Sequence, residues 1–269
     1  MSSKKKQTNN NRPGCAPKGN RTYKRTSMYT GSTYDEVPET LEGETSLYGF
    51  TLDEDQIKLR DAIWNPNIDA VFVDSPAGTG KSMVSIATAF LMCEYDRYSN
   101  IVYVMHPVGD PQGALPGTRT EKSSVYFESL YQTLNLITND WPSKFIKDTS
   151  MADDKDGMGF ITAITDTYLR GSNIGSAFSP TILIVDEAQN FPEFALRKVL
   201  TRACEGTKVI VIGHTLQCDL KAEKSGFARC QKHFRKKNDP EHPRFAFCEL
   251  HNCHRSIVAQ IADEVWDDE

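Results

Sequence analysis

The chain has 269 residues, of which 39% are hydrophobic, and its formal net charge is −5. This composition supports a folded core. No window of 18 apolar residues occurs, and the basic N-terminus lacks the apolar segment of a secretory signal, which argues against a membrane span and against secretion. Seven cysteines, an odd number, favour reduced thiols and a cytoplasmic location.

The charge is distributed unevenly along the chain. Residues 1–34 contain eight Lys and Arg and no acidic residue, which leaves a formal charge of −13 on the remainder. We predict that residues 1–45 form a disordered basic tail followed by an acidic linker, because they are polar and poor in apolar residues. The tail is interpreted either as an arm that contacts nucleic-acid phosphates or as a solubilising segment. Residues 46–269 are predicted to form the folded domain.

Apolar runs alternate with helical patterns through the rest of the chain. Expected strands cover 70–74, 101–105, 160–164, 181–185, 208–212 and 245–250, and expected helices cover 53–63, 82–93, 124–137, 193–204 and 257–265. This alternation predicts an α/β fold with a mainly parallel sheet and helices on both faces. The polar segments 107–123, 140–158 and 225–244 are predicted to be loops.

The most informative segment is 75–82, with the sequence SPAGTGKS, between an expected strand and an expected helix. A glycine-rich loop ending in Lys-Ser at this position is typical of a P-loop, whose backbone N–H groups and helix N-terminus bind phosphate. Lys81 would contact the β- and γ-phosphates, and Ser82 would bind Mg²⁺. Ser75 replaces the usual first glycine. The predicted nucleotide-binding residues here are Pro76, Ala77, Gly78, Thr79, Gly80, Lys81, Ser82 and Met83.

Two carboxylates follow the apolar strand expected at 181–185. Asp186 would hold Mg²⁺ together with Ser82, and Glu187 would act as general base toward water. The alternative, a pair of acids that only caps the next helix, is disfavoured by the P-loop upstream. Gln217 follows the strand expected at 208–212, and its amide would contact the γ-phosphate or the water. A polar turn without such a role is the alternative for Gln217.

A second pattern has the spacing of zinc ligands. Cys230 and His233 are three residues apart, as are Cys248 and His251. Thymidine kinases combine a P-loop with a zinc lobe, so this pattern keeps a nucleoside kinase open as an alternative. Cys248 also fits a small core residue within a strand, which is the interpretation we favour.

With these residues in hand, the chain resembles the PhoH-like family of P-loop ATPases over about residues 51–265. The resemblance depends on the order and combination of its motifs. They are Gln56, the P-loop, GALPG at 113–117 with Glu121 and Lys122, YLRG at 168–171, DEAQN at 186–190, Leu200 to Arg202, Gly206 to Lys208, Gly213 with Gln217 and Asp219, and Lys224 to Gly226.

This resemblance implies a RecA-like core, ATP hydrolysis with Mg²⁺, hexameric rings and a link to RNA or DNA. Gln56 would bind the adenine edge, with a plain surface glutamine as the alternative. An arginine from a neighbouring subunit would complete the site. Arg170, Arg202 and Arg255 are candidates, and we favour Arg202 because it lies on the helix expected after Asp186 and Glu187.

Two positions depart from the family pattern, and both bear on the expected chemistry. His214 stands where the family usually has Asp, and His106 where it usually has Arg.

From the motifs and the resemblance together, we expect an ATP- and Mg²⁺-dependent homo-oligomeric ATPase coupled to nucleic acid. A thymidine-kinase-like enzyme and a nucleotide-dependent interaction protein with little turnover are the alternatives.

Overall fold

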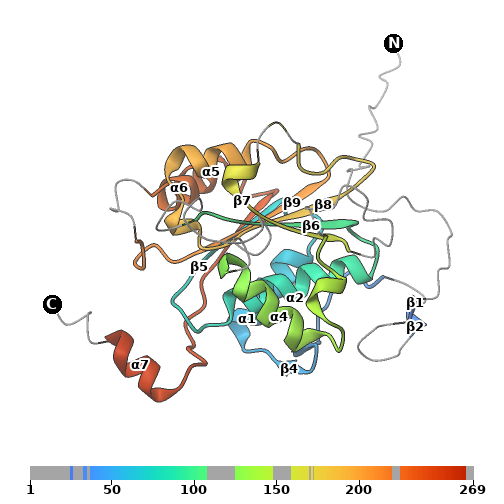
Figure 1. The fold of residues 1–269 in the computed structure, drawn as a ribbon, viewed down its shortest axis with the longest axis horizontal. Helices are drawn as coiled ribbons and strands as arrows, with labels where there is room; N and C mark the ends of the chain where they lie inside the picture. Colours follow the sequence, from blue (N-terminus) through green and yellow to red (C-terminus); the bar gives the residue numbers. More distant parts are fainter. Residues whose placement is uncertain are drawn as a thin grey trace, which may run out of the picture.

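The structure is a computed structural model that describes residues 25–26, 33–34, 37–107, 125–147, 159–169, 171, 173–219 and 225–264. Its centre is a six-stranded sheet in the order β10-β5-β9-β8-β6-β7, and every neighbouring pair is parallel. The strands are β5 (Ala70–Asp74), β6 (Asn100–Met105), β7 (Ile161–Thr165), β8 (Thr181–Val185), β9 (Thr207–Gly213) and β10 (Phe245–Cys248). Helices cover both faces (Figure 1), which confirms the predicted α/β, RecA-like fold class.

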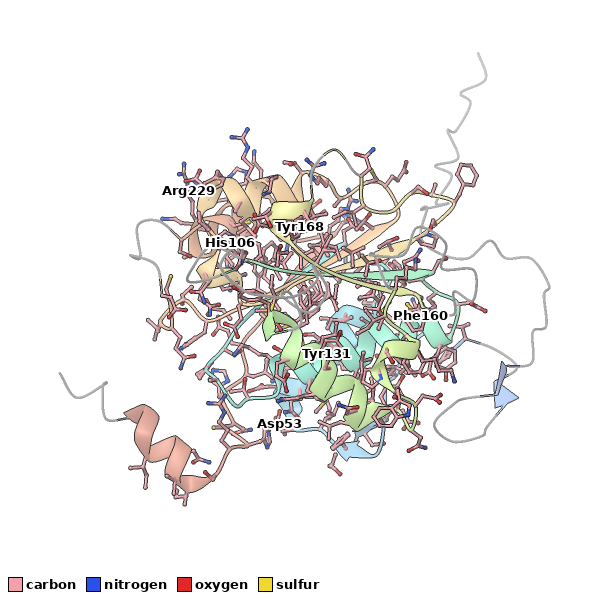
Figure 2. All side chains as sticks on the ribbon, viewed as in Figure 1. Asp53, His106, Tyr131, Phe160, Tyr168 and Arg229 are labelled. Carbon is pink, nitrogen blue, oxygen red and sulfur yellow. The ribbon has the colours of Figure 1, made fainter. Side chains whose placement is uncertain are left out.

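Each face of the sheet has its own apolar core. On one side lie α1 (Glu54–Trp64), α2 (Lys81–Glu94) and α4 (Glu128–Ile137), and on the other lie α5 (Glu193–Leu200) and α6 (Phe227–Lys237). Figure 2 shows the two sides through Tyr131 on α4 and Arg229 on α6. Strands buried on both faces explain why their sequences are continuous apolar runs and do not alternate.

The strand order determines where chemistry can occur. β9 lies between β5 and β8 and pairs with both. The P-loop after β5, the turn after β9 and the carboxylates after β8 therefore meet at one edge of the sheet, the edge where open parallel sheets bind ligands. The prediction that the turn at 213–217 lies beside the P-loop strand is thus confirmed.

The prediction of a loop over 225–244 is wrong for its first half, where α6 forms. Phe227, Gln231 and Phe234 follow a helical spacing, and Phe227 is fully buried. Phe234 packs against Phe72 of β5 with ring centroids 4.9 Å apart. The run of basic residues concealed this apolar stripe, which is sufficient for an amphipathic helix.

The remaining elements are short. They are β1 (Arg25–Thr26), β2 (Thr33–Tyr34), β3 (Ser46–Leu47), β4 (Phe50–Thr51), the 3-10 turns η2 (Val125–Phe127), η3 (Pro142–Lys144), η4 (Asp166–Tyr168) and η5 (Ala188–Asn190), and α7 (Ile257–Glu264). α7 extends away from the sheet in Figure 1. Among the described helices, none has both the length and the apolar character needed to cross a bilayer.

The predicted tail lies mostly outside the described residues, but the end of the predicted linker is described and packs on α1. Arg60, which is buried, donates to the carbonyl oxygens of Leu41 (3.1 Å) and Glu44 (2.5 Å). The Trp64 indole N–H donates to the Pro38 carbonyl at 3.3 Å. Residues 38–44 therefore pack against α1.

Candidate nucleotide site

The P-loop has the backbone geometry that its glycines allow. Gly78 and Gly80 have φ of 81° and 80°, a region that residues with a Cβ rarely adopt. α2 begins at Lys81, and its N-cap Gly80 provides no side-chain cap for the first turn. Thr79 is buried, and its hydroxyl donates to the Pro76 carbonyl at 3.0 Å. A helix N-terminus whose first N–H groups have no side-chain cap is suited to bind an anion.

Ser75, the departure from the usual glycine, has a structural function. Its backbone N–H donates to the Gly213 carbonyl at 3.1 Å, which extends the β5–β9 pairing. Its buried hydroxyl accepts a hydrogen bond from the backbone N–H of Leu250 at 2.7 Å. The hydroxyl thus fixes the chain that leaves β10 beside the P-loop.

The Lys81 side chain is buried inside the loop, and a single backbone carbonyl among the described residues accepts a hydrogen bond from its ammonium group. Its Nζ donates to the Pro76 carbonyl at 3.2 Å. Burial lowers the pKa of Lys81, although the nearby charges of Glu187 and Asp186 act in the opposite direction. A phosphate group would supply the negative charge that this ammonium lacks.

Asp186 joins β8 to the P-loop. Its Oδ1 accepts from the Ser82 hydroxyl at 3.2 Å, and its Oδ2 accepts from the buried Tyr103 hydroxyl at 2.6 Å. Burial, together with the charge of Glu187, raises the pKa of Asp186. A serine hydroxyl and a carboxylate are hard oxygen donors of the kind that Mg²⁺ prefers, so Ser82 and Asp186 fit the metal predicted there.

Glu187 is held by its neighbours in an uncommon backbone conformation, with φ of 52°. Its Oε2 accepts from the side-chain amide nitrogen of Gln189 at 2.5 Å, and the side-chain Oε1 of Gln189 accepts from the backbone N–H of His214 at 3.0 Å. Gln189 therefore links the carboxylate after β8 to the turn after β9.

Residues 251–255, here called the strap, cross the P-loop. The backbone N–H of His254 donates to the Gly78 carbonyl at 2.8 Å, and its imidazole bonds Asp53 at 2.9 Å. A Cβ on Gly78 would lie 2.6 Å from Cγ of Arg255, so this position must be glycine. The side-chain stem of Arg255 therefore lies against the P-loop of its own chain.

Gln56 supports the P-loop from behind. Its amide nitrogen donates to the Thr79 carbonyl at 2.9 Å, and its oxygen accepts from the backbone N–H of Asp53 at 3.2 Å. The second bond belongs to the capping box of α1. The predicted contact with adenine would therefore require Gln56 to exchange one of these bonds, and it stays a prediction.

The model of the PhoH family, described as PhoH-like protein, matches residues 51–265. The chain belongs to the PhoH-like family. Protein PhoH2 of Bacillus subtilis is 32% identical over 157 residues, which cover 57% of this chain and 33% of that protein. Protein PhoH2 of Thermobispora bispora is 26% identical over 244 residues, covering 88% and 52% respectively. This PhoH-like chain thus spans a third to about half of these relatives.

Solved structures that resemble the chain include the large terminase of a thermophilic bacteriophage, with a TM-score of 0.49 and 14% identity over 80% of this chain and 50% of that one. The Hef helicase domain of Pyrococcus furiosus gives a TM-score of 0.41 and 13% identity over 72% and 37%.

The predicted site residues of this PhoH-like protein fall into two groups. Lys81, Ser82, Asp186 and Glu187 come together, and Gln217 lies exposed in the turn after β9 at the same edge. Arg202 does not lie on the helix as predicted, because α5 ends at Leu200, and it is found at the opposite edge of the sheet. Its carbonyl accepts from Ile174, whose own carbonyl accepts from Thr207 at the start of β9. Arg170, residues 113–117 with Glu121 and Lys122, and Lys224 lie outside the described residues.

The structure does not assemble the zinc pattern. Cys230 is on α6 and Cys248 is in β10, and burial raises the pKa of each thiol to about 11. The imidazole of His251 bonds Asp55 at 2.9 Å. Within the described residues, no group of three or more His, Cys, Asp and Glu has an arrangement that could hold a metal ion.

Sequence reasoning missed several residues of the site. Tyr103 lies mid-strand in β6, where an apolar run gives no signal that its hydroxyl reaches Asp186. Asp74, the last residue of β5, accepts from the backbone N–H of Thr215 at 2.9 Å. His106 departs from the family pattern, but the sequence does not predict its bond to the buried Asp166 at 2.8 Å. Burial acts to raise the pKa of Asp166, but bonds from His106 and Lys198 outweigh it and lower this pKa.

Proposed function

We propose that this PhoH-like protein binds ATP with Mg²⁺ and hydrolyses it. The observation that carries the proposal is the 3.2 Å hydrogen bond between Ser82 of the P-loop and Asp186, with Glu187 beside it. This bond brings the phosphate-binding loop and the acidic strand end within reach of one ligand. The residues form a constellation for phosphoryl transfer, in which positioning and charge supply most of the catalysis.

Each residue has a defined task in this proposal. Lys81 compensates phosphate charge, and the N–H groups at the start of α2 bind phosphate oxygens. Ser82 and Asp186 hold Mg²⁺, which supplies further compensation of phosphate charge when bound. Glu187 accepts a proton from water, and Gln189 keeps its carboxylate oriented.

The test is ATP turnover by the parent and Glu187→Gln. Loss of a general base should lower turnover about 10²–10⁴-fold while nucleotide affinity stays near the parent value. Glu193→Gln is the matched control, because it removes an exposed carboxylate of α5 that pairs with Arg229. Parent-like turnover by Glu187→Gln would refute the assignment. Phosphate transfer to thymidine in place of release to water would favour the kinase alternative.

We further propose that hydrolysis is coupled to RNA or DNA, as the family resemblance implies. The basic segment 1–34 is one candidate contact, on a remainder of charge −13. Each phosphate that it neutralises on a single strand should contribute about −0.7 to the log–log salt slope. Deleting residues 1–34 should therefore flatten the slope if the segment binds, and an unchanged slope would assign it a solubilising role.

We also propose a ring-shaped homo-oligomer in which a neighbouring subunit contributes Arg202. The position of Arg202 at the sheet edge opposite the P-loop supports a role between subunits. Excess Arg202→Ala subunits mixed into the parent should lower the rate per parent subunit. A monomer with full activity would overturn this proposal. A cytoplasmic location is part of the proposal, supported by cysteines that are free thiols throughout the described residues.

A further inference from the structure

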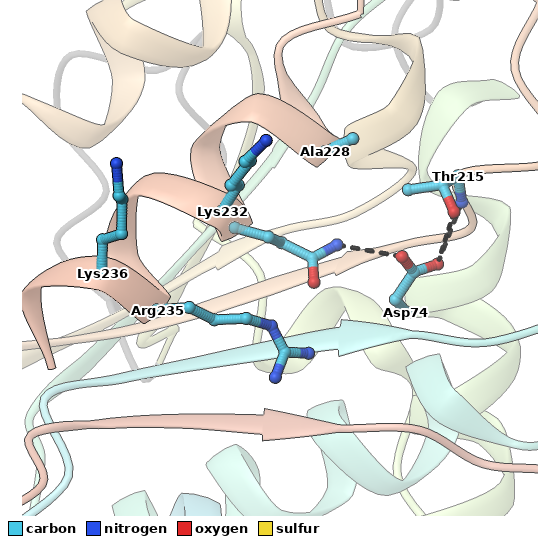
Figure 3. A pocket seen from close by; sticks show the side chains of 7 residues that line it. Asp74, Thr215, Ala228, Lys232, Arg235 and Lys236 are labelled. Carbon is cyan, nitrogen blue, oxygen red and sulfur yellow. Dashed lines mark hydrogen bonds between the residues drawn. The ribbon is translucent and has the colours of Figure 1, made fainter. Parts of the chain in front are cut away.

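A cavity of about 470 Å³ opens between α6 and the strand ends that carry the nucleotide site (Figure 3). Asp74 at the end of β5 and Thr215 after β9 form one wall. The other wall is one face of α6, with Gln231, Lys232, Arg235 and Lys236. We call this cavity the α6 groove. None of these side chains is used in the hydrolysis proposed above.

The α6 groove has a strongly positive wall. α6 contains five Lys and Arg and no acidic residue, in a chain whose residues after 34 carry −13. Arg235 is held in place, with its guanidinium 4.2 Å from the centre of the Phe247 ring and 3.6 Å from the Glu249 carboxylate. Lys232 and Lys236 are exposed, and no ion pair is present for either among the described residues.

The arrangement of these cations indicates the ligand. Lys232, Arg235 and Lys236 are spaced so that they share one helix face over more than a turn. In Figure 3 Lys232 and Lys236 point to the same side and form a strip along the helix, whereas the Arg235 guanidinium turns toward the strands, so the cations do not converge on one small anion. A strip of cations over an open groove suits the sugar–phosphate backbone of a single strand, which a positively charged groove can follow. Both oxygens of the Asp74 carboxylate on the facing wall already accept hydrogen bonds, one from Thr215 and one from Gln231.

Hydrogen bonds connect the groove to the proposed catalytic base. The Gln231 amide donates to Oδ2 of Asp74 at 3.0 Å, and Oδ1 of the same carboxylate accepts from the backbone N–H of Thr215 at 2.9 Å. The adjoining His214 N–H donates to Gln189 at 3.0 Å, and Gln189 donates to Glu187 at 2.5 Å. A displacement of α6 would therefore reach Glu187 through bonded groups.

We propose that the α6 groove binds the backbone of single-stranded nucleic acid, and that its occupancy is transmitted to Glu187 through Gln231, Asp74, the 214–215 turn and Gln189. The coupling half rests on the proposed ATP hydrolysis, but the binding half does not. Gln231 is a positioning residue in this scheme, since it acts through Asp74.

The binding half is tested by fluorescence anisotropy of labelled oligothymidylate and oligouridylate with the full chain, without ATP, over a range of salt. Lys236→Ala should weaken binding and flatten the salt slope by about 0.7. Lys237→Ala is the matched control, because this neighbouring lysine of the same helix does not line the groove. Lys232→Ala/Lys236→Ala should flatten the slope by about 1.4. Equal effects of Lys236→Ala and Lys237→Ala would overturn the groove as the site.

The coupling half is tested by Gln231→Leu, which removes the bond to Asp74 at similar volume. At saturating oligonucleotide we expect loss of most of the stimulation of ATP turnover, with a parent-like salt slope because Gln231 carries no charge. A thermal melt identifies a variant that is merely unfolded, and Gln231→Met repeats the test with a flexible side chain. Parent-like stimulation in both folded variants would overturn the connection to Glu187.

The outcomes separate this inference from the proposed function. A parent that hydrolyses ATP and is stimulated by an oligonucleotide, but whose response does not depend on Lys232, Lys236 or Gln231, contradicts only the α6 groove. A parent that binds the oligonucleotide through the groove but does not hydrolyse ATP contradicts the proposed function and leaves the binding site standing. A parent that binds no oligonucleotide contradicts both the groove and the nucleic-acid coupling.

Discussion

Two buried lysines lie at opposite ends of the sheet and differ in how their charge is accommodated. Lys208, 1% exposed near the start of β9, donates to the carbonyl oxygens of Asn65 (2.9 Å) and Ile68 (2.6 Å). Lys81, 9% exposed beyond the end of β5, donates to the Pro76 carbonyl at 3.2 Å. The first lysine connects the end of α1 to the sheet, whereas the second has a lowered pKa because burial is incompletely compensated.

This difference extends to the groups around each lysine. At the Lys81 end, Asp186 has a raised pKa and Glu187 has a positive φ. At the Lys208 end, the buried ammonium is matched by carbonyl acceptors in a fixed turn. At the P-loop end, the buried charge of Lys81 is arranged as a phosphate ligand would require. At the opposite end, the buried charge of Lys208 stabilises the fold. The predictions below test that distinction.

The largest effect is expected for Lys81→Met on nucleotide binding. Removing the cation should cost about 2–5 kcal/mol of ATP affinity, as for a buried charge pair that loses one partner. The thermal midpoint without nucleotide should stay level or rise, because a poorly compensated ammonium is removed. Titration calorimetry and scanning calorimetry measure the two quantities. A clear fall in the nucleotide-free midpoint would show that Lys81 stabilises the fold as Lys208 does.

The converse is expected for Lys208→Met. Two buried carbonyl oxygens lose their donor, so the free energy of unfolding should fall by about 2–4 kcal/mol, measured by urea denaturation. ATP affinity of the folded fraction should match the parent. Lys58→Met, at an exposed lysine that pairs with Asp55, serves as the control for loss of a charge. A variant that unfolds at the parent midpoint would remove the structural half of the comparison.

The sequence predicted the P-loop end of the sheet better than the opposite end. A P-loop and an acidic strand end are short-range patterns whose spacing carries the chemistry, so Lys81, Ser82, Asp186 and Glu187 were predicted together. Lys208 contacts residues about 140 positions away in sequence, and no local pattern shows such a contact. α6 was missed because its basic residues concealed the stripe of Phe227 and Phe234. Gln56 is a residue of the family pattern, but the sequence does not reveal its hydrogen bonds to Thr79 and Asp53.

A smaller effect on turnover is expected for Tyr103→Phe, which tests the environment of Asp186 at the P-loop end of the sheet. The Tyr103 hydroxyl opposes the increase that burial causes in the pKa of Asp186, and hydrogen bonds to charged groups contribute about 1.5–3 kcal/mol. Without it this pKa should rise further. The ionised form of Asp186, which we propose binds Mg²⁺, would then be lost at a higher pH, so turnover should fall first on the acid side. Turnover against pH and Mg²⁺ concentration measures this effect.

Tyr131→Phe is the control for Tyr103→Phe. Tyr131 is a half-buried tyrosine of α4, on the same side of the sheet, and burial alone raises its pKa. Removing the Tyr131 hydroxyl should leave the dependence of turnover on pH and on Mg²⁺ concentration unchanged. If the two variants behave alike, the bond between Tyr103 and Asp186 has no part in metal binding.

The smallest effect on stability is expected at the strap, which crosses the P-loop. The pKa of Asp55 is lowered to about 2, mainly by the hydrogen bond with His251 and then by Lys58. A lowered carboxylate pKa contributes stability that is complete above the ordinary value near 4 and is lost as pH falls toward 2. Because the His251 and Lys58 side chains are exposed, the contribution should be under about 1 kcal/mol.

Asp55→Asn isolates that contribution. The parent should exceed Asp55→Asn in unfolding free energy by a fraction of a kcal/mol near pH 6, and the difference should vanish near pH 2 and shrink in high salt. Asp140→Asn, at an exposed carboxylate that pairs with Lys144 in the segment after α4, controls for loss of a surface ion pair. Because the strap bonds Gly78, Asp55→Asn should also release ATP faster, and Asp140→Asn should not. Equal release rates would mean that the backbone bond from His254 to Gly78 holds the strap without help from the imidazole of His251.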